Sequence, residues 1–252
     1  MLLCQTPADE LQFILKARAS GVLNDIDPDQ YPENSHIGHQ CMMCADSDQM
    51  RDTIKHHERV MESLTSRHGW LGMYGGALLI PAHSPINTGE GKFILEHFYL
   101  GYLLDKGSTI PLFSHGKCGM AQLYDLSVPA CLQLLGDSKE TTREFFRKRR
   151  NAVESIVGVR IDFLKRLQRE VSHTELELET KLDRSEVTAI YRAEKLLALK
   201  GLSLSDVLGR PQPKVVAQYQ VDYGTFGGEA KKRTYFFDRH AFNNLKQVRG
   251  SM

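Results

Sequence analysis

Two cysteines and one histidine in this chain have the types and spacing of zinc ligands. His115 and Cys118 lie three residues apart, directly after a short apolar run at 110–113. Cys44 follows another apolar stretch, and Asp46 comes two residues later. Zinc takes thiolate and imidazole ligands in a tetrahedral arrangement, and a catalytic site keeps one position open for water. The sequence therefore predicts a metal site made by Cys44, His115 and Cys118.

A closed zinc site is the alternative arrangement of the same residues. Cys41 precedes Cys44 by three positions, so the two could join His115 and Cys118 in a four-ligand structural site. If Cys41 and Cys44 lie on a strand, side chains three apart point to opposite faces, which disfavours Cys41. A second alternative is that the thiols are simply buried, because free cysteine is among the most buried residue types. Cys4 and Cys131 are expected to be inert.

The elements around the ligands alternate between strand and helix, which predicts a parallel sheet with right-handed crossovers. In such sheets, sites form at the carboxyl ends of the strands, so Cys44 and His115 are expected to share one site. The expected elements are a strand from residue 39 that ends at Cys44, a helix at 48–67, a strand at 70–80 interrupted by Gly75 and Gly76, a loop at 81–91, a buried helix at 92–104 and the strand at 110–113. Paired glycines indicate a turn or a close approach of the backbone.

The rest of the chain predicts helices and one hairpin. We expect an N-terminal helix at 7–19 with Leu15 on its buried face, and helical structure throughout 138–209, where Ser138 starts one helix and Asp183 or Ser185 another. Residues 214–223 and 234–237 predict a β-hairpin, and 239–248 a short helix. The fold class is α/β, with a mostly parallel central sheet flanked by helices. The expected organisation is a single domain over 1–252, comprising an N-terminal helical arm (1–36), a zinc-site α/β core (37–135), a helical segment (136–210) and a C-terminal hairpin and helix (211–252).

Charge and hydropathy exclude some classes of protein. The 32 Lys and Arg residues nearly balance the 31 Asp and Glu residues, so nothing in the net charge of +1 favours nucleic acid or an anionic membrane. A basic cluster at 143–150 is interpreted as a solvated helix face paired with Glu140, Glu144 and Glu154. No apolar run approaches the roughly 18 residues that span a bilayer. The N-terminus lacks the basic start of a signal peptide, so a cytoplasmic protein with reduced thiols is expected.

Three short motifs, taken in order, resemble those of the β-class carbonic anhydrases. They are Cys44-Ala45-Asp46-Ser47, Gly75-Gly76-Ala77 and Ser114-His115-Gly116-Lys117-Cys118-Gly119, and the resemblance covers roughly residues 37–123. It implies a homodimer or higher oligomer, with Zn²⁺ held by Cys44, His115 and Cys118. It also implies that Asp46 accepts a hydrogen bond from a metal-bound hydroxide, or closes the site as a fourth ligand. Gly75, Gly76 and Gly119 would support the site.

The resemblance implies a zinc lyase of the carbonate dehydratase type, which reversibly hydrates carbon dioxide to bicarbonate. The family pattern places an arginine two residues after the aspartate, where this chain has Asp48, and Arg51 is the residue that could replace it. The alternative function is a catalytically altered or inactive zinc-binding relative that acts as a structural or interaction protein through 138–209. A third is an enzyme acting on a related electrophile, such as a sulfur analogue of carbon dioxide. Apart from the small substrate and further copies of the chain, no nucleic-acid or membrane partner is expected.

Overall fold

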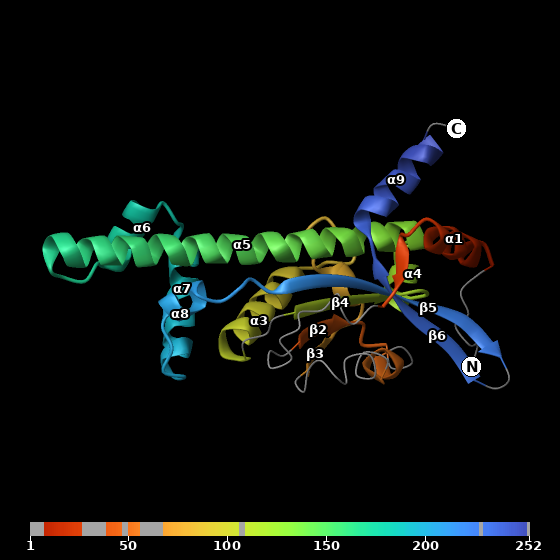
Figure 1. The fold of residues 1–252 in the computed structure, drawn as a ribbon, viewed down its shortest axis with the longest axis horizontal. Helices are drawn as coiled ribbons and strands as arrows, with labels where there is room; N and C mark the ends of the chain where they lie inside the picture. The colour runs from red at the N-terminus through yellow and green to blue at the C-terminus, as the bar shows by residue number, and fades with distance from the viewer. Residues whose placement is uncertain are drawn as a thin grey trace.

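The computed structural model describes residues 8–26, 39–46, 50–55, 68–105, 109–226 and 229–250. Within these ranges six strands form one sheet in the order β1-β6-β5-β4-β2-β3 (Figure 1). The strands are β1 (Leu23–Asp25), β2 (His39–Met43), β3 (His68–Gly72), β4 (Thr109–His115), β5 (Lys214–Phe226) and β6 (Glu229–Phe237). β3, β2, β4 and β5 run parallel, and β6 and β1 are antiparallel to their neighbours. The predicted mostly parallel α/β sheet and C-terminal hairpin are therefore confirmed.

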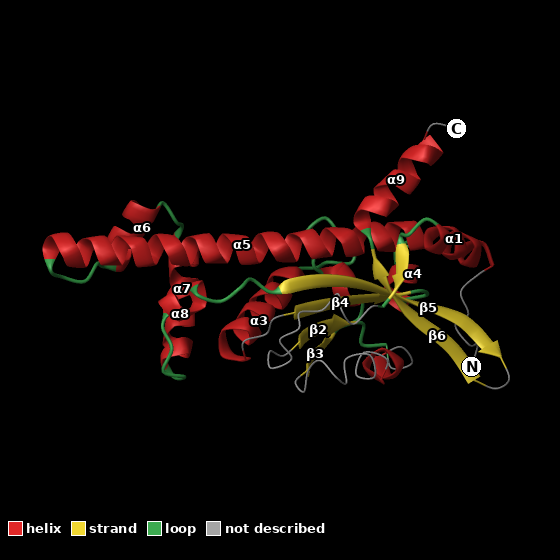
Figure 2. Ribbon diagram, viewed as in Figure 1, coloured by secondary structure: helices red, strands yellow, loops and turns green. Residues whose placement is uncertain are grey.

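Helices flank this sheet, and the longest of them extends well past it (Figure 2). The helices are α1 (Ala8–Ala19), the 3₁₀-helix η2 (Gly76–Leu79), α3 (Glu90–Asp105), α4 (Gly119–Leu123), α5 (Val128–Leu167), α6 (His173–Thr180), α7 (Arg184–Ala198), α8 (Leu204–Leu208) and α9 (Arg239–Gly250). Residues 50–55 are also helical, whereas the rest of the predicted helix at 48–67 lies outside the described residues. α5 runs along one face of the sheet, and α6, α7 and α8 lie at its far end (Figure 1).

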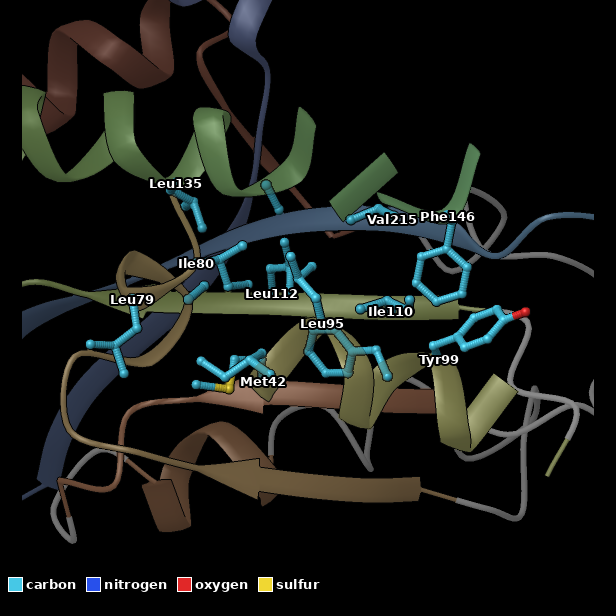
Figure 3. Close-up of a cluster of buried hydrophobic side chains, with 14 of the residues drawn as sticks. Met42, Leu79, Ile80, Leu95, Tyr99, Ile110, Leu112, Leu135, Phe146 and Val215 are labelled. Atoms are coloured by element: carbon cyan, nitrogen blue, oxygen red, sulfur yellow. The ribbon is translucent and has the colours of Figure 1, made fainter. Parts of the chain in front are cut away.

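The main hydrophobic core lies between the sheet and α5 and α3 (Figure 3). Ile110 and Leu112 of β4 point to this side, where they belong to one buried cluster with Leu135 of α5. Phe113 points to the opposite face and joins a second cluster with Cys41 and Met43. β4 is buried at every position because both faces of the sheet are covered there. This double burial holds the carboxyl end of β4 in place.

The chain after β3 differs from the predicted strand at 70–80. β3 ends at Gly72, and residues 76–79 form η2 instead. Gly75 and Gly76 have φ values of 98° and 55°, in the left-handed region that glycine tolerates best. Two successive positive φ values cannot continue an extended strand, so the prediction was wrong beyond Gly72. The glycine pair makes a turn, as its composition indicated.

The start of the long helical region also differs from the prediction. α5 begins at Val128, with the Ser127 hydroxyl capping it by accepting a hydrogen bond from the Ala130 N–H. Ser138 lies inside α5, fully buried, and its hydroxyl contacts the carbonyl oxygens of Ala77 and Leu134, each at 2.6 Å. Ser138 therefore ties α5 to η2 and does not start a helix.

Two other expectations for this region are confirmed. Asp183 caps α7, because its side chain accepts a hydrogen bond from the Glu186 N–H. The basic cluster on α5 pairs with the predicted acids through Arg143–Glu140, Arg147–Glu144, Lys148–Glu144 and Arg150–Glu154. Arg149 differs, because its side chain is largely buried and contacts Glu96 of α3, which was not predicted.

Two apolar side chains in helices that were predicted to be buried are exposed instead. Leu15 of α1 is 58% exposed, and Phe93 of α3, within the helix predicted to be buried, is 61% exposed. α1 buries Ile14, as its periodicity predicts, together with Ala17. Each of these helices meets the core along a stripe narrower than its run of apolar residues. Periodicity therefore identified the helices correctly but overestimated how much of each is covered.

Candidate metal centre

The three predicted ligands come from the carboxyl ends of two neighbouring parallel strands. Cys44 directly follows β2, His115 is the last residue of β4, and Cys118 precedes α4. β2 and β4 pair in parallel, with Met42 opposite Leu112, so both strands end at the same edge of the sheet. The topology thus brings together residues that lie far apart in the sequence, as the strand pattern predicted.

The distances between the ligand atoms suit a tetrahedral metal ion. The sulfur atoms of Cys44 and Cys118 and a ring nitrogen of His115 all lie within 4.8 Å of one another. The two sulfur atoms are 3.7 Å apart. Two thiolates that each lie about 2.3 Å from a tetrahedral zinc would be separated by about 3.8 Å. All three residues are buried, with exposed fractions of 4%, 4% and 1% for Cys44, His115 and Cys118.

The ring of His115 is oriented for metal binding through Nε2. Its Nδ1 lies 2.8 Å from the carbonyl oxygen of Gly116. A carbonyl can only accept, so Nδ1 carries the proton and Nε2 keeps a free lone pair. Nε2 is buried and has no hydrogen-bond partner. Buried polar atoms nearly always have a hydrogen-bond partner, so the unpaired Nε2 is what we expect of a nitrogen whose lone pair coordinates a metal ion.

Backbone N–H groups surround the sulfur of Cys44. The N–H of Gly75 donates to Cys44 Sγ at 3.4 Å, and the backbone N–H of Asp46 donates to it as well. Between the two sulfurs, their mutual hydrogen bond raises the pKa of Cys44 and lowers that of Cys118. Without a metal, the two sulfurs of Cys44 and Cys118 therefore favour sharing one proton. A bound cation would displace that proton.

Gly76 lets the turn after β3 approach the ligand-bearing strands. A Cβ added there would lie 2.8 Å from the backbone nitrogen of Cys44 and 2.9 Å from the carbonyl oxygen of Phe113. Only glycine fits so close to two backbones. At Gly119, by contrast, an added Cβ meets nothing within 4 Å, so its supporting role stays a prediction.

Asp46 and Arg51 stand apart from the ligand group. Asp46 is half-buried beside Cys44, and its carboxylate is not among the clustered ligand atoms. Within the described part of the chain, three side chains offer ligand atoms that lie close together, and no described His, Cys, Asp or Glu adds a fourth. Arg51 is exposed on the helical segment at 50–55, and Asp48 lies outside the described residues. The roles of Asp46 and Arg51 stay predictions.

Neither Cys41 nor Cys131 belongs to the ligand group. Cys41 is buried on the opposite face of the sheet with Met43 and Phe113, which contradicts the closed four-ligand site and confirms the argument from strand alternation. Burial raises the pKa of the Cys41 thiol. Burial also raises the pKa of Cys131 to about 12, which fits the expected inert thiol. Cys4 lies outside the described residues.

Two polar residues next to His115 were missed by the sequence reasoning. Gln220 of β5 pairs with His115, and its carbonyl oxygen accepts a hydrogen bond from the Gly116 N–H at 2.9 Å. Thr234 of β6 pairs with Gln220 in turn. Both side chains are buried, at 2% and 4% exposure. The signal that could have found Gln220 is a glutamine on the inward face of a strand that is otherwise mostly apolar.

A cavity of about 610 Å³ lies away from the metal centre, between the loop after η2, α3, α5 and the start of α7. Its wall carries charges of both signs, among them Arg149 and Glu96, which bond to each other.

No helix in the described ranges combines the length and apolar character needed to cross a membrane. Comparison of the chain with family models, curated proteins and solved structures found no match in any of the three.

Proposed function

We propose that this protein is a zinc enzyme that reversibly hydrates carbon dioxide to bicarbonate. The observation that carries the proposal is the group formed by Cys44, His115 and Cys118, whose ligand atoms lie within 4.8 Å of one another. Three ligands of this kind, with no fourth among the described residues, match catalytic zinc sites, which keep one position for water. The order of the motifs along the chain adds the resemblance to β-class carbonic anhydrases.

Different residues of the chain would hold the ion, orient its ligands and position the water at such a site. The Cys44 and Cys118 thiolates and the His115 Nε2 would hold the ion, while the Gly116 carbonyl fixes the ring through Nδ1. Zinc, when bound, supplies a Lewis acid that makes water a nucleophile near neutral pH. The Asp46 carboxylate would accept a hydrogen bond from the attacking water and direct its lone pair toward the carbon of carbon dioxide. The Gly75 N–H lowers the charge density on Cys44 Sγ.

Stopped-flow carbon dioxide hydration tests the proposal, on protein confirmed to hold one zinc per chain, from neutral to alkaline pH. We expect a rate above that of the buffer that rises with pH, because alkaline conditions favour deprotonated water at the site. The Cys118→Ser variant should lose zinc and activity together. Cys131→Ser, which changes a buried thiol outside the ligand group, should keep both. Zinc-loaded protein with no activity at any pH would overturn the proposal.

One observation favours the alternative of a structural zinc site. All three ligands are buried, whereas substrate must reach a catalytic metal. In that case Cys118→Ser would lower stability, and the wild-type protein would bind zinc without hydrating carbon dioxide. The same stopped-flow series, read together with the zinc content, separates the two functions.

A further inference from the structure

Three adjacent strands place buried polar side chains in one row that begins at the metal centre. His115 of β4 pairs with Gln220 of β5, and Gln220 pairs with Thr234 of β6. Residues that pair across a sheet project to the same face, with Cβ atoms roughly 5 Å apart. The strand register therefore places the three residues in one row across β4, β5 and β6. We call His115, Gln220 and Thr234 the polar row.

Each member of the polar row carries a buried polar atom without a hydrogen-bond partner. These atoms are His115 Nε2, Gln220 Oε1 and Thr234 Oγ1. Leaving a buried donor or acceptor unpaired is costly, so each such group calls for an explanation, and a bound water, ion or ligand is one. The metal accounts for Nε2. It does not account for the amide and the hydroxyl, which lie one and two strands away from His115.

The outer end of the row is fixed by an ion pair. Lys232 lies two residues before Thr234 on β6 and so projects to the same face. Its ammonium group lies 2.8 Å from the Asp52 carboxylate, and its side chain is only 11% exposed. Asp52 belongs to the helical segment at 50–55, which follows Cys44 along the chain. The segment that leaves the metal centre is thereby tied to β6, next to the polar row.

We infer that Gln220 and Thr234 form a subsite for bicarbonate beside the metal. The inference rests on the proposed function and names the side chains that would bind bicarbonate, the product of the proposed reaction. Bicarbonate has one O–H donor and two further oxygen acceptors on a planar anion. The Thr234 hydroxyl donates to an anionic oxygen, and the Gln220 Oε1 accepts from the O–H. Each orphaned atom thus gains a partner of the right kind, and the row recognises an anion that carries a proton.

Formate is a matched probe because it is planar and singly charged but lacks the O–H group. The experiment uses cobalt-loaded protein, in which binding of an anion near the ion changes the visible absorption of the metal. Bicarbonate and formate are titrated in turn. Thr234→Val should weaken both anions about tenfold, because a hydrogen bond to a charged group is lost. Gln220→Met should weaken bicarbonate by a similar factor and leave formate unchanged.

Thr109→Val is the matched control for Thr234→Val. Thr109 is also fully buried, with an unpartnered hydroxyl on the same face of the sheet, but it lies at the opposite end of β4, about 20 Å from His115. It should bind both anions like the wild type. Thr234→Ser restores the hydroxyl and should restore affinity, which separates lost binding from lost packing.

The inference is overturned if Thr234→Val and Gln220→Met bind bicarbonate as tightly as the wild type, or if Thr109→Val weakens it equally. It is also overturned if the protein does not load cobalt. Absorption changes with bicarbonate in a protein that does not hydrate carbon dioxide would defeat the proposed function and leave the subsite standing. If the protein hydrates carbon dioxide but both subsite variants keep wild-type activity and anion binding, the proposed function stands and the subsite is overturned.

Discussion

Gly76 joins the turn after β3 to the two strands that carry the metal ligands. Its φ of 55° is left-handed, and its α-carbon packs against the backbones of Cys44 and Phe113. Backbone atoms cannot move aside as the end of a flexible side chain can. Any side chain at this position must therefore push the two strand ends apart.

We expect Gly76→Ala to destabilise the protein by about 2 kcal/mol or more, because it combines a strained φ with backbone overlap. It should also reduce the zinc content, since the overlap falls on the backbone of Cys44. Urea unfolding and metal analysis measure the two effects. Gly119→Ala, at an open position next to Cys118, should change stability by less than about 1 kcal/mol. Equal effects of the two substitutions would show that the close approach does not matter.

Individual residues decided how much of the site could be predicted. Cys44, His115 and Cys118 were found because thiolate and imidazole chemistry is rare and the strand pattern put them at one edge of a sheet. Gln220 and Thr234 were not found because their place beside His115 depends on strand register, which the hairpin pattern alone does not fix. A glutamine in a mostly apolar strand marks Gln220 as unusual, but nothing local indicates that it lies beside His115.

At the scale of elements, an ion pair between a largely buried arginine and a partly exposed glutamate connects α5 to α3. The Arg149 guanidinium contacts the Glu96 carboxylate and lies 5.1 Å from the centre of the Phe145 ring. The Arg149 side chain is only 11% exposed, and its Nε atom has no partner. Without Glu96, this buried cation would lose its counter-charge.

Glu96→Ala should therefore lower the free energy of unfolding by about 2 kcal/mol, which is less than the roughly 3–5 kcal/mol for a fully buried pair because Glu96 is partly exposed. Glu140→Ala is the comparison, because Glu140 also pairs with an arginine of α5 but both partners are about half-exposed. It should cost less than about 1 kcal/mol. Urea unfolding of both variants checks this, and similar losses would contradict a special role for the pair with Arg149.

The start of α6 depends on pH through Glu175. The Arg169 guanidinium, together with the Ser172 N–H and hydroxyl, lowers the pKa of Glu175 to about 2. A carboxyl whose pKa falls on folding stabilises the folded state above its unfolded pKa of about 4.3, and this contribution disappears as pH falls toward 2.

We expect the stability difference between wild type and Glu175→Gln to be constant at neutral pH and to shrink between about pH 4 and pH 2. Urea midpoints measured across this range provide the check. Glu179→Gln, at an exposed position on the same helix, is the control and should not reproduce that change. A difference that does not vary with pH would show that the cap does not titrate as the geometry indicates.

The elements themselves were predictable to different degrees. The start of α7 was predicted at Asp183 or Ser185, because both are capping residue types before an apolar periodic run, and the structure selects Asp183. Ser138 was misread because a serine inside a helix and a serine at its start look alike in sequence. What distinguishes them is the carbonyl of Ala77, which belongs to a distant part of the chain.

At the scale of the whole molecule, the metal centre joins parts of the chain that are 74 residues apart. Cys44 and Cys118 both belong to a hydrophobic core that includes residues from α1 through to α9. An ion bound by these residues would therefore connect two strand ends within the same core. Its binding free energy adds to the stability of the folded state wherever the unfolded chain binds the ion less well.

Removing the metal should lower the thermal midpoint of unfolding. At a free zinc concentration about 1,000 times its dissociation constant, the loss corresponds to about 4 kcal/mol. Thermal scans with zinc and with a chelator measure it. Cys118→Ser should unfold at the same temperature in both conditions. A chelator shift of the same size in that variant would mean that the effect does not arise at this site.

The length of α5 has a mechanical consequence. Its 40 residues correspond to about 60 Å, and the end that carries α6 and α7 extends past the sheet (Figure 1). Near its start, Ser138 anchors the helix to η2, directly after the turn at Gly76. α5 also packs against β4 and β5 of the sheet. A movement of the sheet near the metal centre would therefore be carried to the far end of the helix, where a tilt of about 6° moves a point 30 Å along it by about 3 Å.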